Sequence, residues 1–344
     1  MPELSTRRMG TVPRTRPSAT LAIHEQVAAL RRAGRNIFHL GFGESRFPVH
    51  PRLQQALADH ADRAGYLPIL GLPELREAVA AFSFREHNRV CHPDQVVIGP
   101  GSKMLMYAAL LALKGDLLLP APSWVSYEPQ AHLVQKEVHW LPTNERDGYT
   151  LQPGILASAV QRLRKEGHHP RILLLNSPSN PTGVGYPAAL LAELSAVARR
   201  EHLVILSDEI YALTQHDGQT PVSIASFFPE GTIVSTGLSK HLSLGGWRLG
   251  AMELPAGRLG AGLRTRLEAI ASETWSAVVA PIQYAALTAY SDDPELREYR
   301  QWCARAHGVL VHFLRQKLLD CGLVCPRPNA AFYLFPSFEP FRDN

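Results

Sequence analysis

The 344-residue sequence contains no long apolar run, few cysteines and little net charge, and each absence disfavours a class of function. No hydrophobic stretch approaches the ~20 residues of a membrane-spanning helix, so we expect no membrane partner. The four cysteines offer no metal-ligand spacing beyond a loose pair at Cys321 and Cys325. We therefore expect no metal, and reduced core thiols in a cytoplasmic protein.

The net charge of +4 is small for this length, and much of the positive charge lies near the N-terminus. The segments "STRRMGTVPRTRPS" and "ALRRAGR" are typical of a mobile or surface-lying arm. An arm that binds nucleic acid is the alternative, but no basic patches interleaved with aromatic residues follow, so we expect no nucleic-acid partner. Glu3 and the lack of a cleavage pattern argue against a transit peptide.

Five short apolar runs bounded by turn residues predict strands. They are continuous rather than alternating, which is typical of strands buried on both faces in a parallel sheet between helices. The runs are "VVIG" from 96, "DLLLPAP" from 116, "RILLLNSP" from 171, "HLVILSDE" from 202 and "TIVSTG" from 232. Helical patterns lie between them, so the sequence predicts an α/β fold.

Three segments carry the clearest helical patterns. In "LPELREAVAAF", Pro73 suits the first turn, and Leu75, Val79 and Phe82 share one face. The segments "SKMLMYAALLAL" and "PAALLAELSAVARREH" predict two further helices. After Pro281 the pattern is mostly helical and ends in the strand-like "AAFYLFPSF", which predicts the beginning of a smaller second domain.

Ligands of open parallel sheets bind beyond the carboxyl ends of the strands, so the loops after the five predicted strands are expected to converge on one crevice. In the first loop, Gly99, Gly101 and Ser102 form either a phosphate site at a helix N-terminus or a simple strand-to-helix turn. The dinucleotide fingerprint Gly-x-Gly-x-x-Gly fails because Met104 takes the third glycine position.

Four side chains in the other loops each have a structural and a functional interpretation. Asp208 is either the N-cap of a helix over "DEIYAL" or a carboxylate that pairs with a protonated ring nitrogen. Tyr211 comes one helical turn after Asp208 and is therefore expected at the same crevice. Asn180 is a turn residue or an amide donor to a ligand oxygen. Trp124 is a core residue or a surface on which a planar cofactor stacks.

Lys240 and Arg248 stand close together in "STGLSKHLSLGGWRLGA", a segment without a carboxylate to pair either of them. A surface lysine is the structural interpretation of Lys240. If the amine is desolvated instead, its neutral form becomes accessible and condenses with an aldehyde to an imine. Arg248 then supplies a fixed positive charge for a phosphate. The combination with the other four loops favours this second interpretation.

Taken together, these residues resemble the class I/II family of pyridoxal-phosphate-dependent aminotransferases, of the aspartate aminotransferase fold type, from about residue 17 to residue 336. The order and spacing of the matching segments make the resemblance specific. These segments are "LGFGESRFPVHP", "GYLPILGLPELREAVAAF", "GPGSKMLMYAALLAL", "LLLPAPSWVSYEP", "NSPSNPTG", "SDEIYALTQHDG" and "SKHLSLGGWRLG".

The resemblance implies a role for each position. Lys240 forms a Schiff base with pyridoxal 5'-phosphate and moves the substrate proton, and Asp208 holds the pyridinium nitrogen. Tyr66 reaches the phosphate of the neighbouring subunit in a homodimer, and the backbone of Gly43 approaches the substrate carboxylate. The other implied cofactor contacts are Asn180 and Tyr211 at the ring hydroxyl oxygen, Trp124 on the ring face, Gly101, Ser102 and Arg248 at the phosphate, and Lys103 and Ser239 beside them.

Three departures from the family pattern concern the substrate. The family's Gly-Glu-Pro-Asp becomes Gly-Glu-Ser45-Arg46, which makes the entrance more cationic. Lys103 is similar to a lysine that some bacterial-type aspartate aminotransferases use for a distal carboxylate, which favours a dicarboxylic substrate. The likeness stops several dozen residues before the usual end of the family, where an arginine for the substrate α-carboxylate normally lies. We expect a truncated chain; the alternative is a shorter protein in which Arg46 takes over part of that role.

The sequence therefore predicts a fold type I pyridoxal-phosphate-dependent transferase with a mostly parallel sheet flanked by helices and a smaller, incomplete α+β domain. We place an arm with part of the small domain at 1–45, the large cofactor-binding domain at 46–281 and the small domain at 282–344. The predicted enzyme moves an amino group between aspartate, or a similar amino acid, and a 2-oxo acid, as a homodimer. A lyase or synthase on the same fold, or a weakened cofactor-binding regulator, is the alternative.

Overall fold

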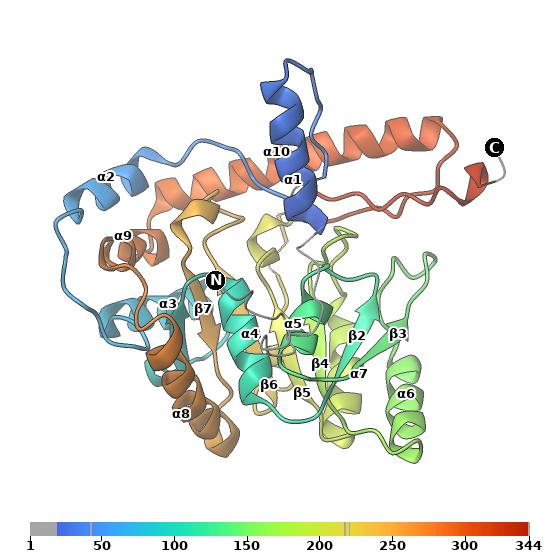
Figure 1. The fold of residues 1–344 in the computed structure, drawn as a ribbon, viewed down its shortest axis with the longest axis horizontal. Coiled ribbons are helices and arrows are strands. Elements are labelled where there is room, and N and C mark those ends of the chain that lie inside the picture. The colour runs from blue at the N-terminus through green and yellow to red at the C-terminus, as the bar shows by residue number, and fades with distance from the viewer. Residues whose placement is uncertain (1–18, 42, 217, 220, 343–344) are drawn as a thin grey trace, which may run out of the picture.

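The computed structural model describes residues 19–342 apart from 42, 217 and 220, so most of the predicted arm lies outside the described residues. Within these residues, seven strands form one sheet in the order β1-β7-β6-β5-β4-β2-β3 (Figure 1). The strands are β1 (Val96–Gly99), β2 (Asp116–Ala121), β3 (Val138–Pro142), β4 (Pro170–Asn176), β5 (Val204–Asp208), β6 (Thr232–Gly237) and β7 (Gly250–Glu253).

All strands run in one direction except β7, which pairs antiparallel with both β1 and β6. The five predicted strands are confirmed as β1, β2, β4, β5 and β6. The strands β3 and β7 were not predicted, because neither is a continuous apolar run. β3 is a partly exposed edge strand, and β7 is four residues long and begins with glycine. The shared direction brings the carboxyl ends of the five predicted strands to one edge of the sheet.

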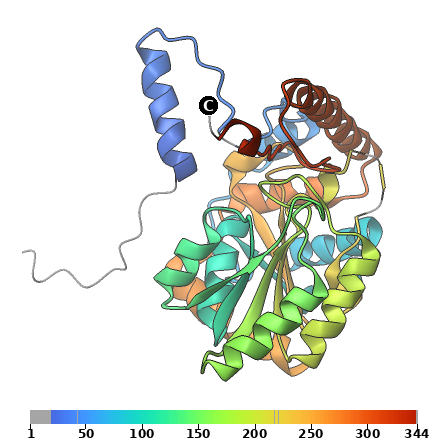
Figure 2. The same cartoon turned by 90° about the vertical axis from the view of Figure 1, so that its right-hand side faces the viewer.

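Helices cover both faces of the sheet (Figure 2). Leu105, Leu119 and Leu267 are buried in the core on one face, and Leu118, Leu156 and Leu194 are buried in the core on the other. The first face is covered by α4 (Ser102–Ala112), α5 (Tyr127–Leu133) and α8 (Gly257–Thr274), and the second by α6 (Pro153–Lys165) and α7 (Ala188–Arg200).

A third group of helices packs beside β1, where Leu53, Phe82 and Ala286 share a core with Ile98. Pro73 begins the middle helix of this group, as predicted, because its missing N–H costs nothing in a first turn. The group comprises α2 (Pro51–Asp59), α3 (Pro73–His87) and α9 (Ala280–Tyr290).

The helix α10 (Pro294–Asp320) crosses above the carboxyl edge of the sheet (Figure 1), and α1 (Ala19–Arg32) stands clear of the body in the view of Figure 2. The division of the chain at 45 and 281 stays a prediction. Short 3₁₀ helices lie at Pro93–Gln95, Ala212–Thr214, Ile224–Ser226, Gly245–Trp247 and Glu339–Phe341.

Two local predictions were wrong. The segment "DEIYAL" is not an α-helix; it holds only the 3₁₀ turn Ala212–Thr214. The segment "AAFYLFPSF" is not a strand, since only the isolated bridges Gln215–Ala330 and Val324–Ser337 form near it. The amide of Ala331 donates to the carbonyl oxygen of Thr214 at 3.1 Å, which joins the segment after α10 to the 3₁₀ turn.

Among the described residues, no helix is both long and apolar enough to cross a bilayer. All four cysteines are free thiols. Cys303 and Cys325 are buried as predicted, whereas Cys321 is exposed at the end of α10 and the prediction of a core thiol was wrong there.

Candidate active site

Asp208 is the last residue of the central strand β5 and forms the floor of the crevice, with 3% of the residue exposed. The hydroxyl of Tyr127 donates to its Oδ2 at 2.7 Å, and the amide of Ile210 donates to its Oδ1 at 3.2 Å. Burial raises the pKa of Asp208, and these hydrogen bonds and the charge of Lys240 oppose the rise. A buried carboxylate of this kind gains energy from a cationic ring nitrogen.

Lys240 follows the neighbouring strand β6 and is largely desolvated. Its Nζ donates to the carbonyl oxygen of Gly43 at 2.7 Å and lies 5.6 Å from the ring centre of Tyr211 and 5.8 Å from that of Phe332. Burial lowers the pKa of Lys240 to about 8, against the opposing charges of Asp208 and Glu44. A neutral, nucleophilic amine is therefore accessible near neutral pH.

Three polar side chains line the side of the crevice next to Asp208. Asn180 Nδ2 donates to the Tyr211 hydroxyl at 3.4 Å, and the hydroxyls of Tyr211 and Tyr333 lie 2.6 Å apart. Burial is the main reason that the pKa of Tyr211 is raised, so its hydroxyl keeps its proton and remains a donor. Tyr211 reaches this part of the crevice from the loop after β5, and not from the predicted helical turn.

The loop after β1 and the segment after β6 meet at a cationic corner. Gly101 is the N-cap of α4 with φ +88°, and a Cβ there would lie 2.5 Å from a guanidinium nitrogen of Arg248. Glycine is thus required both by the backbone angle and by the close approach of Arg248. Lys103 Nζ lies 5.1 Å from the ring centre of Trp124. Burial and the charge of Arg248 lower the pKa of Lys103.

These charges test whether pyridoxal 5'-phosphate fits the site. Lys103, Lys240 and Arg248 gather at the crevice, and the only carboxylate of comparable burial that interacts with them among the described residues is Asp208. This excess of cations suits a ligand that brings its own anion. The free amides at the start of α4 and the adjacent guanidinium suit a phosphate. The residues present therefore fit the cofactor.

The remaining predicted residues lie at the margin of this group. Ser102 is the first residue of α4, and Ser239 lies in the turn beside Lys240; both are partly buried. Arg46 is exposed and pairs with Glu44 at 3.0 Å. Tyr66 lies in the loop between α2 and α3 and is 98% exposed, so no residue that the structure describes covers it.

Three further residues of the site were not predicted from the sequence. Tyr127 donates to Asp208, and Tyr333 contacts both Tyr211 and Gly43, where a Cβ would lie 2.0 Å from its hydroxyl oxygen. Asn176 ties the floor together, because its Nδ2 donates to the Asp208 carbonyl and its Oδ1 accepts from the Asn180 amide. Of these three, only Asn176 could have been predicted as a site residue, because it is the last residue of a predicted strand. The two tyrosines come from elements whose local pattern points to packing alone.

A mostly parallel sheet with a desolvated lysine above a buried aspartate at its carboxyl edge defines the class: the chain has the fold of type I pyridoxal-phosphate-dependent transferases. A family model for aminotransferase class I and II matches residues 35–343. The chain belongs to this family and is an aminotransferase.

Individual relatives agree with this assignment. The chain is 33% identical to an aspartate/prephenate aminotransferase of Cereibacter sphaeroides over 96% of this chain and 81% of the relative. It is also 33% identical to an aspartate aminotransferase of Geobacillus stearothermophilus, over 93% and 80%. Its structure is similar to that of an aspartate aminotransferase from Thermus thermophilus with maleate, with a TM-score of 0.90 and 27% identity, over 100% of this chain and 87% of that one.

Proposed function

We propose that the chain holds pyridoxal 5'-phosphate at the carboxyl edge of its sheet and transfers the amino group of aspartate, or of a similar dicarboxylic amino acid, to a 2-oxo acid. One observation carries the cofactor assignment: Lys240 follows β6 and Asp208 ends the adjacent strand β5, the first a desolvated amine and the second a buried carboxylate.

When bound, the cofactor supplies an aldehyde and a ring that withdraws electrons from the substrate's α-carbon. Asp208 holds a negative charge at the floor for the ring nitrogen. Lys240 is the residue that would hold the aldehyde through its amine and, when not engaged there, would take and return the substrate proton at Nζ. Tyr211 and Asn180 donate hydrogen bonds to the ring oxygen, and Trp124 presents its flat face to the ring.

The phosphate is assigned to the cationic corner. Gly101 and Ser102 open α4, whose N-terminus suits an anion, and Arg248 provides the charge. Ser239 stands beside Lys240 and is assigned a hydrogen bond to the same phosphate.

Lys103 supports a dicarboxylic substrate. It is half-buried, and within the described residues it makes no ion pair, so a second carboxylate of the substrate gives it a partner. The two relatives named above are called aspartate or aspartate/prephenate aminotransferases, and the similar structure was solved with maleate, a dicarboxylate. The exposed Arg46 is assigned to the entrance, where it attracts such anions, and the backbone of Gly43 faces the substrate carboxylate.

We further propose a homodimer. Tyr66 is 98% exposed, and Phe38 and Leu40 in the segment before the crevice are 86% and 84% exposed, which suits burial by a second copy. In that dimer Tyr66 reaches the partner's phosphate site. A cytoplasmic location is likewise a proposal, supported by the four unpaired thiols. Sedimentation velocity at several protein concentrations tests the dimer, and a monomer throughout would contradict it.

The substrate assignment is tested by single-turnover conversion of the cofactor-loaded protein with aspartate, glutamate and alanine. We expect aspartate to be preferred and oxaloacetate to be released. Release of pyruvate, ammonia and hydrogen sulfide from cysteine would indicate lyase chemistry instead. In Lys103→Met we expect the aspartate KM to rise by about tenfold or more and the alanine KM to change little, because a charge-assisted bond is worth roughly 1.5–3 kcal/mol. Lys114→Met, at an exposed lysine, is the matched control.

A further inference from the structure

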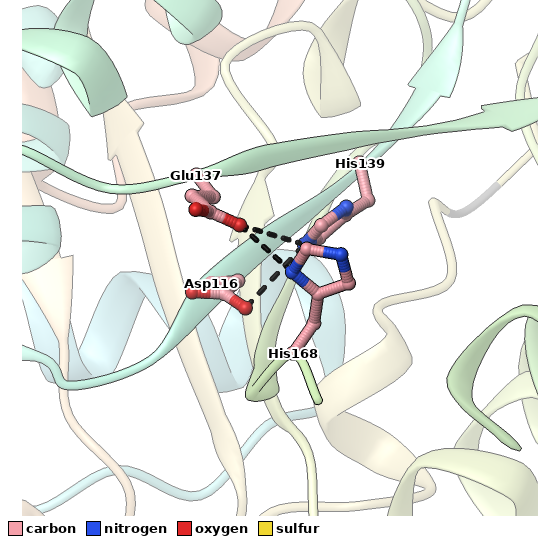
Figure 3. A group of neighbouring side chains, drawn as sticks. All are labelled: Asp116, Glu137, His139 and His168. Atoms are coloured by element: carbon pink, nitrogen blue, oxygen red, sulfur yellow. Dashed lines mark hydrogen bonds and ion pairs between the residues drawn. The ribbon is translucent and has the colours of Figure 1, made fainter. Parts of the chain in front are cut away.

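Four potential metal ligands converge at the opposite edge of the sheet, away from the crevice (Figure 3). They are Asp116, Glu137, His139 and His168, and each offers one ligand atom such that all four atoms lie within 4.8 Å of one another. Asp208 and the loops of the candidate active site follow the carboxyl ends of the strands, whereas these four residues stand at or before the strand beginnings. The cluster therefore has no part in the function proposed above.

The register of the sheet explains why the four side chains meet. Leu117 pairs with Val138, so the preceding residues Asp116 and Glu137 lie side by side. Side chains two apart in a strand share a face, which places His139 beside Glu137. Pro170 pairs with Asp116, and His168 comes two residues before it, in the loop that follows α6.

Backbone bonds fix this arrangement. The amide of Asp116 donates to the carbonyl oxygen of His169 at 2.8 Å, and the amide of His169 donates to Asp116 Oδ2 at 2.7 Å. The amide of Leu117 donates to the carbonyl oxygen of Glu137 at 2.9 Å. The carboxylate of Asp116 is thus oriented by an outer hydrogen bond, a common feature of metal-ligating groups.

The distances suit a small tetrahedral cation. His168 Nδ1 lies 2.9 Å from Glu137 Oε2, and His139 Nε2 lies 3.4 Å from Asp116 Oδ2 and 4.0 Å from Glu137 Oε2. Ligands held about 2.0–2.2 Å from zinc in a tetrahedron are separated by roughly 3.3–3.6 Å, and the three separations above bracket that spacing. The side chain of Glu137 is 65% exposed and therefore has room to adjust its position.

We propose that this cluster is a structural zinc site. Two imidazoles and two carboxylates are ligands that zinc accepts, whereas calcium and magnesium prefer oxygen alone. Four protein ligands leave no open position, so the ion holds structure and does no chemistry. The ion joins the edge strand β3 and the loop before β4 to the strand β2, at the edge of the sheet.

The rival interpretation is a set of surface ion pairs. His139 is well covered, with 13% of its side chain exposed, and its ring centre lies 4.6 Å from that of His168. In that interpretation each ring contacts one carboxylate: His168 Nδ1 contacts Glu137 and His139 Nε2 contacts Asp116. A single cation instead engages all four ligand atoms at once.

The test uses the full chain after dialysis against a chelator, with zinc chloride alone as the added ligand. We expect calorimetry to give one zinc per chain and thermal melting to shift upward with zinc, because only the folded chain presents the site. Cobalt(II) in place of zinc is expected to give the intense visible absorption of tetrahedral coordination.

His139→Ala and His168→Ala are each expected to weaken zinc binding by more than about 100-fold, since even loss of an outer-sphere partner weakens metal sites 10–100-fold. His132→Ala, at an exposed histidine outside the cluster, is the matched control and should bind zinc unchanged. Melting curves without metal show whether each variant is folded. The proposal is overturned if the folded wild-type chain binds no stoichiometric zinc, or if both cluster variants bind it as the control does.

Discussion

The Nζ of Lys240 donates a 2.7 Å hydrogen bond to the backbone carbonyl oxygen of Gly43, which joins the turn after β6 to the segment that leads into α2. This bond holds the amine without giving it a carboxylate partner. Burial can therefore lower the pKa of Lys240 to about 8, and the amine remains available for covalent chemistry.

The desolvated amine makes the cofactor-free chain less stable. Lys240 is charged in the unfolded chain up to a pKa of about 10.5, but in the folded chain only up to about 8. Lys240→Met should therefore stabilise the cofactor-free protein below about pH 8, by on the order of 3 kcal/mol. As pH rises from 8 toward 10 the wild type should regain stability relative to the variant, because the unfolded chain then binds more protons. Urea unfolding across this pH range measures the difference, and Lys114→Met should show none of it.

Asp208 is expected to determine the rate of amino transfer. In Asp208→Asn the charge that pairs with the ring nitrogen is lost, while the size and the hydrogen bond from Tyr127 can be kept. We expect the rate of amino transfer to fall by at least ~100-fold, because electrostatic stabilisation in a buried site is worth roughly 3 kcal/mol or more. Tyr127→Phe removes only a neutral donor and should cost about tenfold or less. Equal losses in the two variants would contradict the assigned role of Asp208.

The close approach of Gly43 and Tyr333 can be tested by a double-mutant cycle. In Gly43→Ala the new Cβ meets the Tyr333 hydroxyl, so we expect a loss of about 1–3 kcal/mol in stability and displacement of the carbonyl that holds Lys240. Tyr333→Ala removes the obstacle, and in that background the same substitution should cost much less. Strictly additive effects in thermal unfolding would show that the two residues do not meet.

A buried ion-pair network lies behind the crevice. Arg89 is 7% exposed and bonds to Glu253 at 2.7 and 2.8 Å and to Glu209, the neighbour of Asp208, at 3.2 Å. Burial alone would raise the pKa of Glu253, but the charge and hydrogen bonds of Arg89 hold it below its usual value. Arg89→Met leaves two buried carboxylates without their cation and should cost about 3–5 kcal/mol in a denaturant titration. Arg162→Met, in an exposed pair with Glu166, should cost at most about 1 kcal/mol.

The sequence predicts the parts of this protein that depend on local pattern. The five buried strands are continuous apolar runs, and because they are parallel their carboxyl ends meet, so Lys240, Asp208 and Asn180 come together as expected. The antiparallel strand β7 and the edge strand β3 depend on pairing between distant segments and leave no such pattern. The same holds for Tyr333, whose contact with Tyr211 arises only when the segment after α10 folds back. The wrong helix at "DEIYAL" has a related cause: the carbonyl oxygen of Asp208 accepts from the Ser177 amide, and the amide of Glu209 donates to the Ser235 carbonyl oxygen, so the segment begins in the sheet rather than in a helix.

Reductive labelling shows whether Lys240 is the amine that holds the cofactor. The purified chain is loaded with pyridoxal 5'-phosphate, treated with borohydride, digested and sequenced by mass spectrometry, with Lys240→Ala in parallel. The account predicts one phosphopyridoxyl group per chain, on Lys240, and none on the variant. A label on Lys103 or another lysine at equal occupancy, or an unchanged label on the variant, would contradict it.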